Sequence, residues 1–545
     1  MTPSGKRRVA ASIVLLGIFA TPPAVLAQGT SDAATAGTVT AAAATLPLGP
    51  TDLSELRTTT TLQPGVTLTT IVRGAADPAN VWTVEISIPA GETSPDPDAP
   101  PRALSDRASA EALAERLREA GFDPRVEEVL TPATADFAGG SLGWRVRVGS
   151  FTDKAGADAL RTRLVAAGFA GASLFTGWDG SPTDRGPWRL QVLTIDPKMF
   201  DGSLRASFGP DIEDRETTSA LARAQGATAG VNAGYFVFDP GSGAPGDLAG
   251  VGVYGGRLLS ETVGHRPALA VRADASHAQV ERVQWVGTIE GYDGIRLTLD
   301  GIDRVPRLIR NCGGTADDVP TSQPLHDFTC TDADELVAFT SDFGESTPSG
   351  PGLEAVLDRQ DRVVSLRSPR GGPLLRGEQS VQATGSLVGD LSAAAVIGEP
   401  LRVAAKLRGE RDQVVGQQPS GSIVNGGPEL VRDGRLHVTP RADGFVRPTD
   451  PSFYYGFSAK RNPRTFAGVD ASGRLILATA DGRSTASLGL SIVETGAVAR
   501  ALGMRDALNL DGGGSTTMVV DGQVINQPSD AAGERPVGDV LLILP

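Results

Sequence analysis

Glycine and proline together make up about 19% of the 545 residues, whereas about 12% is ordinary. Proline ends regular elements, and glycine allows the backbone angles that tight turns require. We therefore expect many short strands joined by turns, and few long helices. The chain is longer than one hydrophobic core usually supports, so two or three folded units with linkers are expected.

The charge pattern argues against several classes of function. The chain has 50 Lys and Arg against 64 Asp and Glu, a formal net charge of −14. Nucleic-acid binding requires clustered cations, and the one basic run is at residues 6–8, so no nucleic-acid partner is expected. There are four histidines, none in an HExxH arrangement, which argues against a zinc hydrolase. A P-loop motif is also absent from the sequence.

Residues 1–27 have the pattern of a signal peptide. A basic cluster at residues 6–8 precedes the apolar stretch 9–20, and the Val-Leu-Ala at residues 25–27 fits a cleavage site. The apolar stretch is shorter than the ~20 residues of a membrane-spanning helix, so export with cleavage is favoured over a membrane anchor. We therefore expect an exported protein, extracellular, cell wall-associated or periplasmic, with no stable membrane span.

The two cysteines, Cys312 and Cys330, are expected to form a disulfide bond. An oxidising compartment favours pairing of two cysteines this close in sequence. Such a bond would restrict the unfolded chain and contribute about 3 kcal/mol to stability. A pair of free thiols in a flexible loop is the alternative.

The sequence patterns divide the chain after the signal peptide into three parts. Residues 28–79 read as a linker that can include a first strand of the larger unit, residues 80–178 as a small α/β domain, and residues 186–545 as the larger unit. In the small domain, period-two strands alternate with amphipathic helices capped at Ser105 and at Thr152 or Asp153. The predicted strand–helix–strand–strand–helix–strand order covers residues 82–88, 105–120, 125–129, 143–149, 152–167 and 172–176.

This small domain resembles the SPOR domain family. The residues that carry the resemblance are Val148-Gly149-Ser150-Phe151 and, at the family's spacing, Ala157, Leu160, Leu164 and Gly168. The resemblance implies a ferredoxin-like fold that binds peptidoglycan glycan strands lacking stem peptides, and thus a wall-targeting module. The insertion Pro89–Ala103 departs from the compact form of the family. A domain that only packs within the molecule is the alternative.

Residues 186–545 read as a mixed α+β domain. Strand-like runs alternate with turns, and hairpin turns are expected at Asp433-Gly434, Asp481-Gly482 and Asp521-Gly522. Ser491 and Glu494 fit a capping box at the start of a helix. The expected strands include residues 188–195, 474–479, 507–510, 518–520 and 539–544.

Asp511 is the strongest single candidate for chemistry. It follows a strand-like run and precedes the three glycines Gly512–Gly514. Glycines let a ligand approach the backbone, and consecutive backbone N–H groups can bind an anion. Ser515 and Thr516 add hydroxyl groups. A carboxylate beside such a loop suits cleavage next to a phosphate; a wide turn between two strands is the structural alternative.

Residues 186–545 resemble the phosphodiester glycosidase family. The resemblance is carried, in chain order, by Asn232–Phe236, Asn425–Pro428, Arg464-Thr465, Asp481–Arg483 and Asn509–Ser515. It implies hydrolysis of a sugar-1-phosphodiester at the anomeric carbon, with release of a free sugar and a phosphomonoester.

The resemblance and the residue chemistry together suggest roles for these positions. Asp511 is expected at the reacting carbon as nucleophile or base, with Asp481 as the second carboxylate. No cofactor is expected, and a divalent cation (Ca²⁺ or Mg²⁺) near Asp511 is left open because no ligand spacing requires it. The asparagines are expected to bind sugar hydroxyls, and the arginines and the glycine loop to bind phosphate. These binding residues are Asn232, Asn425, Arg464, Arg483, Gly512, Gly513, Gly514, Ser515 and Thr516.

Two other functions are compatible with the same residues. One is a non-catalytic protein that binds sugar phosphates at the cell wall. The other is a phosphodiesterase that cleaves on the other side of phosphorus. Two carboxylates together with two arginines favour the glycosidase, and the released products distinguish all three.

Overall fold

The structure is a computed structural model. All the residues it describes belong to Ala41–Pro545, one of two units into which the chain divides. The predicted signal peptide and the segment Pro89–Pro101 lie outside the described residues. Within the described part, no helix is both long and apolar enough to cross a bilayer. The described residues are 44–88, 102–310, 312, 317–321, 329–415, 419–447 and 450–545.

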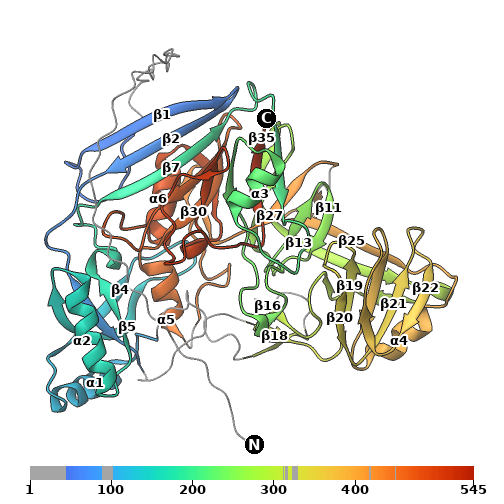
Figure 1. The fold of residues 1–545 in the computed structure, drawn as a ribbon, viewed down its shortest axis with the longest axis horizontal. Helices are drawn as coiled ribbons and strands as arrows, with labels where there is room; N and C mark the ends of the chain where they lie inside the picture. Colours follow the sequence, from blue (N-terminus) through green and yellow to red (C-terminus); the bar gives the residue numbers. More distant parts are fainter. Residues whose placement is uncertain are drawn as a thin grey trace, which may run out of the picture. The chain divides into compact units, whose positions relative to one another are not determined.

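The small domain is a four-stranded antiparallel sheet with two helices (Figure 1). The first helix is capped by Asp106, whose side chain accepts a hydrogen bond from the Ser109 N–H, so the cap lies one residue after the expected Ser105. Asp153 caps the second helix as expected. The sheet order is β4–β5–β3–β6. The elements are β3 (Trp82–Ile86), α1 (Arg107–Glu119), β4 (Pro124–Thr131), β5 (Gly140–Phe151), α2 (Lys154–Ala166) and β6 (Gly171–Phe175).

Polar side chains on this sheet bond to the larger unit around the fully buried Glu85. Its carboxylate accepts hydrogen bonds from Arg147 Nη2, Tyr455 Oη and Lys460 Nζ, each at 2.8 Å. Burial alone would raise the pKa of Glu85, but the charges of Lys460, Arg147 and Arg145 outweigh burial and hold that pKa well below its usual range. The small domain is therefore joined to the larger unit by a buried ionic cluster.

Replacing Glu85 by glutamine is expected to destabilise the folded protein by about 3–5 kcal/mol at pH 7, because the buried Lys460 loses its ion-pair partner and Arg147 keeps Asp179 as its remaining close carboxylate. A depressed pKa contributes stability above the unfolded value of about 4.3, and that contribution is lost as the pH falls below it. The difference between wild type and variant should therefore shrink below about pH 4. Urea unfolding at several pH values measures it. Glu111→Gln, which removes an exposed ion pair with Arg107, is the matched control and should change stability by less than about 1 kcal/mol. Equal effects of the two variants would contradict this account.

The largest sheet joins segments from both sides of the small domain. The strand β2 pairs with β7, which follows the small domain, so residues before that domain contribute two strands to this sheet. Figure 1 shows β1 and β2 in blue beside β7. In sheet order the strands are β1 (Glu55–Gln63), β2 (Val66–Arg73), β7 (Trp188–Ile195), β31 (Leu475–Ala480), β30 (Arg464–Asp470), β32 (Met504–Asn509), β28 (Glu429–Arg432) and β29 (Arg435–Leu436).

The helix α6 (Ile492–Ala501) connects β31 to β32 across this sheet. Both strands pair antiparallel with β30, so they run parallel to each other and require a crossover. The expected capping box is confirmed, with Ser491 and Glu494 bonded in both directions. Glu494 also pairs with Arg461. Both contacts of Glu494 support the fold, in line with a capping residue.

Two further sheets complete the core of the larger unit. One contains β11 (Arg257–Ser260), β10 (Gly252–Tyr254), β27 (Ser422–Asn425), β12 (Pro267–Val271), β13 (Ala278–Glu290), β25 (Arg402–Gly409) and β26 (Val414–Val415), with β14 (Arg296–Thr298) paired to β13. The other contains β34 (Gln523–Val524), β33 (Met518–Val520), β9 (Ala229–Asn232), β35 (Val540–Leu544) and β8 (Ser203–Ser207). Together with strands of the largest sheet, they bury one cluster of mostly aliphatic side chains. The short helices of the larger unit are α3 (Thr218–Gln225), η2 (Pro240–Ser242), η3 (Tyr292–Gly294), α5 (Pro451–Tyr454), η4 (Tyr455–Ala459) and η5 (Gly513–Ser515), and η1 (Thr176–Asp179) precedes them.

A separate five-stranded sheet with its own apolar core lies between β14 and β25 in the chain, in yellow and orange in Figure 1. The sequence analysis did not predict this inserted module. Its elements are β15 (Gly301–Ile302), β19 (Leu336–Thr340), β24 (Gln379–Ala383), β21 (Leu353–Leu357), β22 (Val363–Arg367) and α4 (Leu387–Ala394). Smaller sheets beside it comprise β16 (Ile309–Arg310), β18 (Thr329–Thr331) and β17 (Val319–Pro320), and β20 (Thr347–Gly350) with β23 (Arg370–Gly372).

Most of the local expectations agree with this fold. Asp433-Gly434 and Asp521-Gly522 each join a two-stranded hairpin. The hairpin expected at Asp481-Gly482 is wrong: the strand before it pairs with β7 and β30, and the chain then continues to α6. The disulfide between Cys312 and Cys330 is present, with Cα atoms 5.0 Å apart.

Candidate active site

The antiparallel pairing of three central strands brings distant motifs to one end of the largest sheet. Arg464 begins β30 and pairs with Ala480, while Phe466 pairs with Asn509. The start of β30 therefore lies beside the ends of β31 and β32. Asp481 and Asp511 follow those two ends. Arg464 and Asp511, about 50 positions apart in sequence, therefore meet at one edge of the sheet.

Asn232, at the end of β9, fixes the backbone around Asp511. Its Nδ2 donates to the carbonyl of Asp511 at 2.7 Å, and its Oδ1 accepts from Thr465 Oγ1 at 2.6 Å and from Thr517 N at 3.0 Å. The side chain is fully buried. Since both acceptor positions of its oxygen are used within the protein, this geometry fits a positioning residue. The sugar contact expected from the sequence stays a prediction.

Asn425 holds the backbone of Tyr235 in the same way. Its Oδ1 accepts from Tyr235 N at 2.8 Å, and its Nδ2 donates to the Tyr235 carbonyl at 3.2 Å. The Tyr235 hydroxyl donates to the Gly427 carbonyl at 2.6 Å and accepts from Asn509 Nδ2 at 2.8 Å. Burial raises the pKa of Tyr235, and the nearby negative charge of Asp511 adds to this rise. Tyr235 therefore lies close to Asp511, although the sequence analysis gave it no role.

The three glycines after Asp511 form a tight turn. Gly513 has φ +61°, a conformation that favours glycine, and a Cβ atom on Gly514 would lie 2.1 Å from Arg535 Nη2. Three of the N–H groups donate within the protein: Gly512 to Asp511 Oδ1, Gly513 to Pro463 O, and Ser515 to Gly512 O. The phosphate nest expected for Gly512–Ser515 stays a prediction, and three of its four N–H groups already donate within the protein.

The hydroxyl groups of the two residues after the glycines, unlike most backbone N–H groups of the turn, are not bonded within the described part of the protein. Ser515 and Thr516 are each 1% exposed, and neither hydroxyl oxygen has a hydrogen-bond partner in the described part of the chain. Buried polar atoms usually have hydrogen-bond partners. These two hydroxyl groups beside the turn could therefore donate hydrogen bonds to a bound ligand.

Arg464 is a fully buried arginine without a carboxylate partner among the described residues. Its Nε donates to the Leu490 carbonyl at 3.0 Å, its Nη2 donates to the Phe457 carbonyl, and its Nη1 makes no hydrogen bond within that described set. Burial, together with the charge of Arg483, lowers the pKa of Arg464 to about 10. A buried cation without a counter-charge is costly, so this group is poised for an anion.

Arg483 lies over the glycine turn. A Cβ atom on Gly513 would lie 3.2 Å from Arg483 Nη2, and Arg483 Nε donates to Asn462 Oδ1 at 3.2 Å. The two arginines therefore flank the backbone next to Asp511. The binding of a phosphodiester by these two arginines stays a prediction.

Asp481 bonds to Gln527, whereas the sequence suggested a position beside Asp511 at the reacting carbon. It is 4% exposed, and its Oδ1 accepts from Gln527 N at 2.9 Å. Burial raises its pKa, while hydrogen bonds from Gln527 and Asn526 oppose the rise. Asn526 in turn donates to the Thr516 carbonyl at 3.0 Å. Within the described residues Asp481 thus supports the segment behind the glycine turn and does not bond to Asp511.

An aromatic wall and a buried carboxylate complete the surroundings, and the sequence analysis singled out neither. Phe445 and Phe457 stack at 4.8 Å, and the Arg464 guanidinium lies 5.0 Å from the Phe457 ring centre. Asp539 accepts from Gly234 N at 2.6 Å and from Tyr254 Oη, and burial raises its pKa to about 6. A glycine and aspartate directly before the last strand were the available signal for Asp539.

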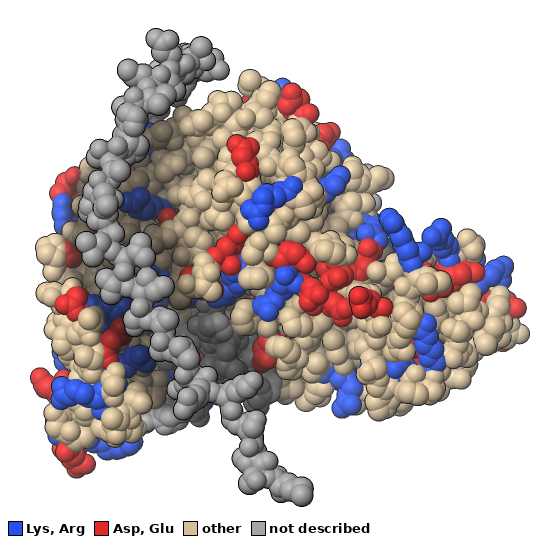
Figure 2. Space-filling view, viewed as in Figure 1, with Lys and Arg blue, Asp and Glu red and all other residues tan. Residues whose placement is uncertain are grey.

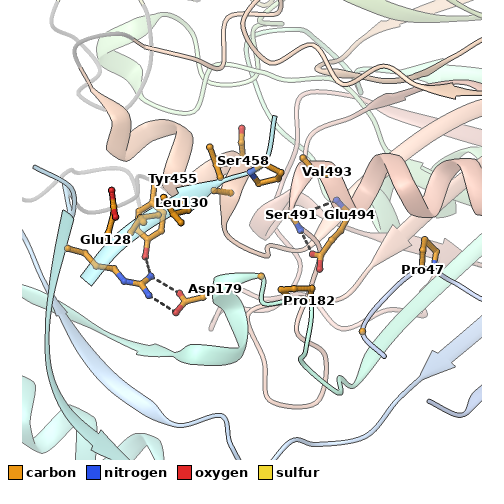
Figure 3. Close-up of a pocket in the computed structure, with 17 residues that line it drawn as sticks. Pro47, Glu128, Leu130, Asp179, Pro182, Tyr455, Ser458, Ser491, Val493 and Glu494 are labelled. Atoms are coloured by element: carbon orange, nitrogen blue, oxygen red, sulfur yellow. Dashed lines mark hydrogen bonds and ion pairs between the residues drawn. The ribbon is translucent and has the colours of Figure 1, made fainter. Parts of the chain in front are cut away.

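A second candidate place is a cavity of about 640 Å³ between the small domain and the larger unit (Figure 3). Arg145 lies in it, but the guanidinium is bonded to both oxygens of Asp179 at 3.1 Å and to Tyr455 Oη at 2.6 Å. Glu494, also drawn in Figure 3, is bonded within its capping box. Because these charges are paired, the cavity is a less suitable place for a phosphate than the surroundings of Arg464.

The fold and this site define a strand-rich α+β protein in which two arginines flank the backbone next to Asp511. Residues 359–544 match the family described as phosphodiester glycosidase, and residues 102–174 match the SPOR domain family. These two parts of the chain are therefore similar to the phosphodiester glycosidase and SPOR families. The glycosidase match includes the motifs at Asn425, Arg464, Asp481 and Asp511, and it begins after Asn232.

Known proteins resemble the chain over different lengths. The human N-acetylglucosamine-1-phosphodiester alpha-N-acetylglucosaminidase is 26% identical over 204 residues, which is 34% of this chain and 39% of the human protein. A crystal structure from Burkholderia pseudomallei, whose name describes an exported protein, is 33% identical, with a TM-score of 0.81 over 92% of this chain and 98% of that chain. A hypothetical protein from Synechocystis shares the fold at 17% identity, with a TM-score of 0.52 over 90% of this chain and 76% of that one.

Proposed function

We propose that this protein is an exported hydrolase that cleaves the C1–O bond of a sugar-1-phosphodiester. The observation that carries the proposal is the buried Arg464, which has no carboxylate partner in the described part and lies beside the turn that follows Asp511. The match of residues 359–544 to the phosphodiester glycosidase family supports the same reaction class. From the name of the human relative, we take an N-acetylglucosamine-1-phosphodiester as the first substrate to test.

In this proposal the phosphodiester lies against the two arginines. Arg464 Nη1 and the Arg483 guanidinium neutralise the diester through charge-assisted hydrogen bonds. Phe445 and Phe457, which stack on each other, form apolar surroundings beside Arg464. The buried hydroxyls of Ser515 and Thr516 are further donors on the same side of the turn.

Asp511 then acts at the anomeric carbon. The C1–O bond breaks, and the electron pair leaves with the bridging oxygen on the phosphomonoester. Water supplies the new hydroxyl at C1, directly with Asp511 as base or after a covalent sugar–Asp511 intermediate. The water proton passes to Asp511 and then to solvent. A phosphate leaving group needs less acid assistance than an ordinary alcohol, so the scheme needs one carboxylate at the reacting carbon and no cofactor.

We assign the remaining predicted residues to positioning. Asn232 holds the Asp511 backbone, Asn425 holds Tyr235, and Asp481 holds the Asn526 segment behind the turn. A divalent cation beside Asp511 has no part in this scheme.

The small domain is proposed to hold the enzyme near peptidoglycan glycan strands. Its SPOR match and its sheet order, which we interpret as ferredoxin-like, support this role. The signal-peptide pattern and the name of the Burkholderia structure favour an extracellular, wall-associated or periplasmic place. Co-sedimentation of the full chain with peptidoglycan sacculi tests this part, and recovery in the supernatant alone would contradict it.

UDP-N-acetylglucosamine is a convenient probe of the reaction, because its sugar is linked at C1 to a phosphate. We expect free N-acetylglucosamine and UDP as products. Binding of the probe without release would favour the alternative, a non-catalytic sugar-phosphate-binding protein. Release of sugar-1-phosphate would favour the phosphodiesterase.

A further inference from the structure

The disulfide-bonded segment next to the inserted module carries an unusual group of carboxylates. The strands β16, β18 and β17 form a small sheet around the Cys312–Cys330 bond. Asp317 and Asp318 lie between the two cysteines in sequence, and Asp332 lies two residues after the second. One oxygen of each of the three carboxylates lies within 4.8 Å of the others.

Asp332 gives this group an independent feature. The residue is 8% exposed, and its Oδ1 accepts a hydrogen bond from Asp334 N at 2.9 Å. Its Oδ2 is buried and has no hydrogen-bond partner among the described residues. A buried carboxylate oxygen without a hydrogen-bond donor costs free energy, and a bound cation would remove that cost.

The groups around Asp332 add negative charge. Asp317, Glu335 and Asp334 are acidic neighbours of Asp332. Figure 2 shows acidic side chains gathered on one face, in the region between β16 and β19 of Figure 1.

We propose that Asp317, Asp318 and Asp332 form a calcium site that ties the disulfide loop to the inserted module. The donors are all oxygens, which suits Ca²⁺ or Mg²⁺ rather than zinc or copper. Calcium is the better fit, because it accepts irregular arrangements of carboxylates, carbonyls and water, whereas Mg²⁺ demands a near-ideal octahedron. The site is distinct from Asp511 and does not depend on the proposed reaction.

The test is calcium binding by the full chain. Isothermal calorimetry measures the binding, and thermal unfolding with CaCl₂ or MgCl₂ measures its effect on stability. We expect saturable Ca²⁺ binding with a dissociation constant of about 10⁻⁴ to 10⁻³ M. In 10 mM CaCl₂ the unfolding temperature should rise by about 2–5 °C, while 10 mM MgCl₂ should give less than half of that rise. An equal rise with both salts, or no measurable binding of Ca²⁺, would overturn the proposal.

Two variants identify the residues. Asp332→Asn should abolish the calcium-dependent rise. Without calcium it should unfold at the wild-type temperature or above it, because like charges have been reduced. Asp318→Asn removes a ligand from the other side of the loop and should weaken Ca²⁺ binding at least tenfold. Asp293→Asn, an exposed turn residue with the same charge change, should keep the full response. Retention of that response in both site variants would also overturn the proposal.

Discussion

Replacing Asp511 by asparagine is expected to lower kcat for UDP-N-acetylglucosamine by about 10²–10⁴-fold, the usual range for loss of a positioned acid–base group. The amide keeps the size of the side chain but neither attacks C1 nor accepts the proton of water. The backbone carbonyl of Asp511, which accepts from Asn232, is unchanged by the substitution. The folded state should therefore survive, and steady-state kinetics with thermal unfolding of the same sample measure both effects.

The matched control is Asp521→Asn at the β33–β34 hairpin. Asp521 has φ +49°, a region that asparagine also adopts readily, so the substitution changes the same charge without backbone strain. It should leave kcat within about twofold. Wild-type turnover by a folded Asp511→Asn protein would remove Asp511 from the reaction.

The second large effect is expected at Arg464. Arg464→Met should lower kcat/KM by about 10–100-fold, because a charge-assisted hydrogen bond to the diester contributes about 1.5–3 kcal/mol. The free energy of unfolding should change by less than about 2 kcal/mol. The variant loses two hydrogen bonds to backbone carbonyls, but it also relieves a buried cation that has no carboxylate partner among the described residues.

Arg461→Met is the contrasting variant. Arg461 is also fully buried, but it pairs with Asp184 and Glu494. Its loss leaves two carboxylates without a counter-charge and should cost about 3–5 kcal/mol of stability. If Arg464→Met lost as much stability as Arg461→Met and kept full kcat/KM, Arg464 would be a structural residue.

Local patterns in the sequence predicted much of the fold. The expected strand at residues 188–195 agrees with β7 residue for residue, and the Ser491–Glu494 capping box and two Asp-Gly hairpins are present. Each of these features depends on residues within about ten positions of one another. The inserted five-stranded sheet was not predicted, because its strands are short buried runs whose partners are distant in sequence.

For the candidate site, too, local patterns were predicted from sequence and the side-chain contacts between distant residues were not. The motifs around Asn232, Arg464 and Asp511 do meet at one end of the sheet, and the motif resemblance was the basis for expecting it. The direction of each side chain could not be read from sequence, because it depends on partners up to about 280 residues away. Asn232 therefore proved to bond inward, and Asp481 to face Gln527. Tyr235 and Asp539 gained importance only through contacts that the fold creates.

The most direct test of the central claim is hydrolysis of UDP-N-acetylglucosamine in H₂¹⁸O, followed by mass spectrometry of the UDP. Cleavage of the C1–O bond leaves the bridging oxygen on phosphorus, so the account predicts UDP without ¹⁸O. Attack at phosphorus would also release free sugar, but with one ¹⁸O in the phosphate. Labelled UDP, or UMP with sugar-1-phosphate, would contradict the account.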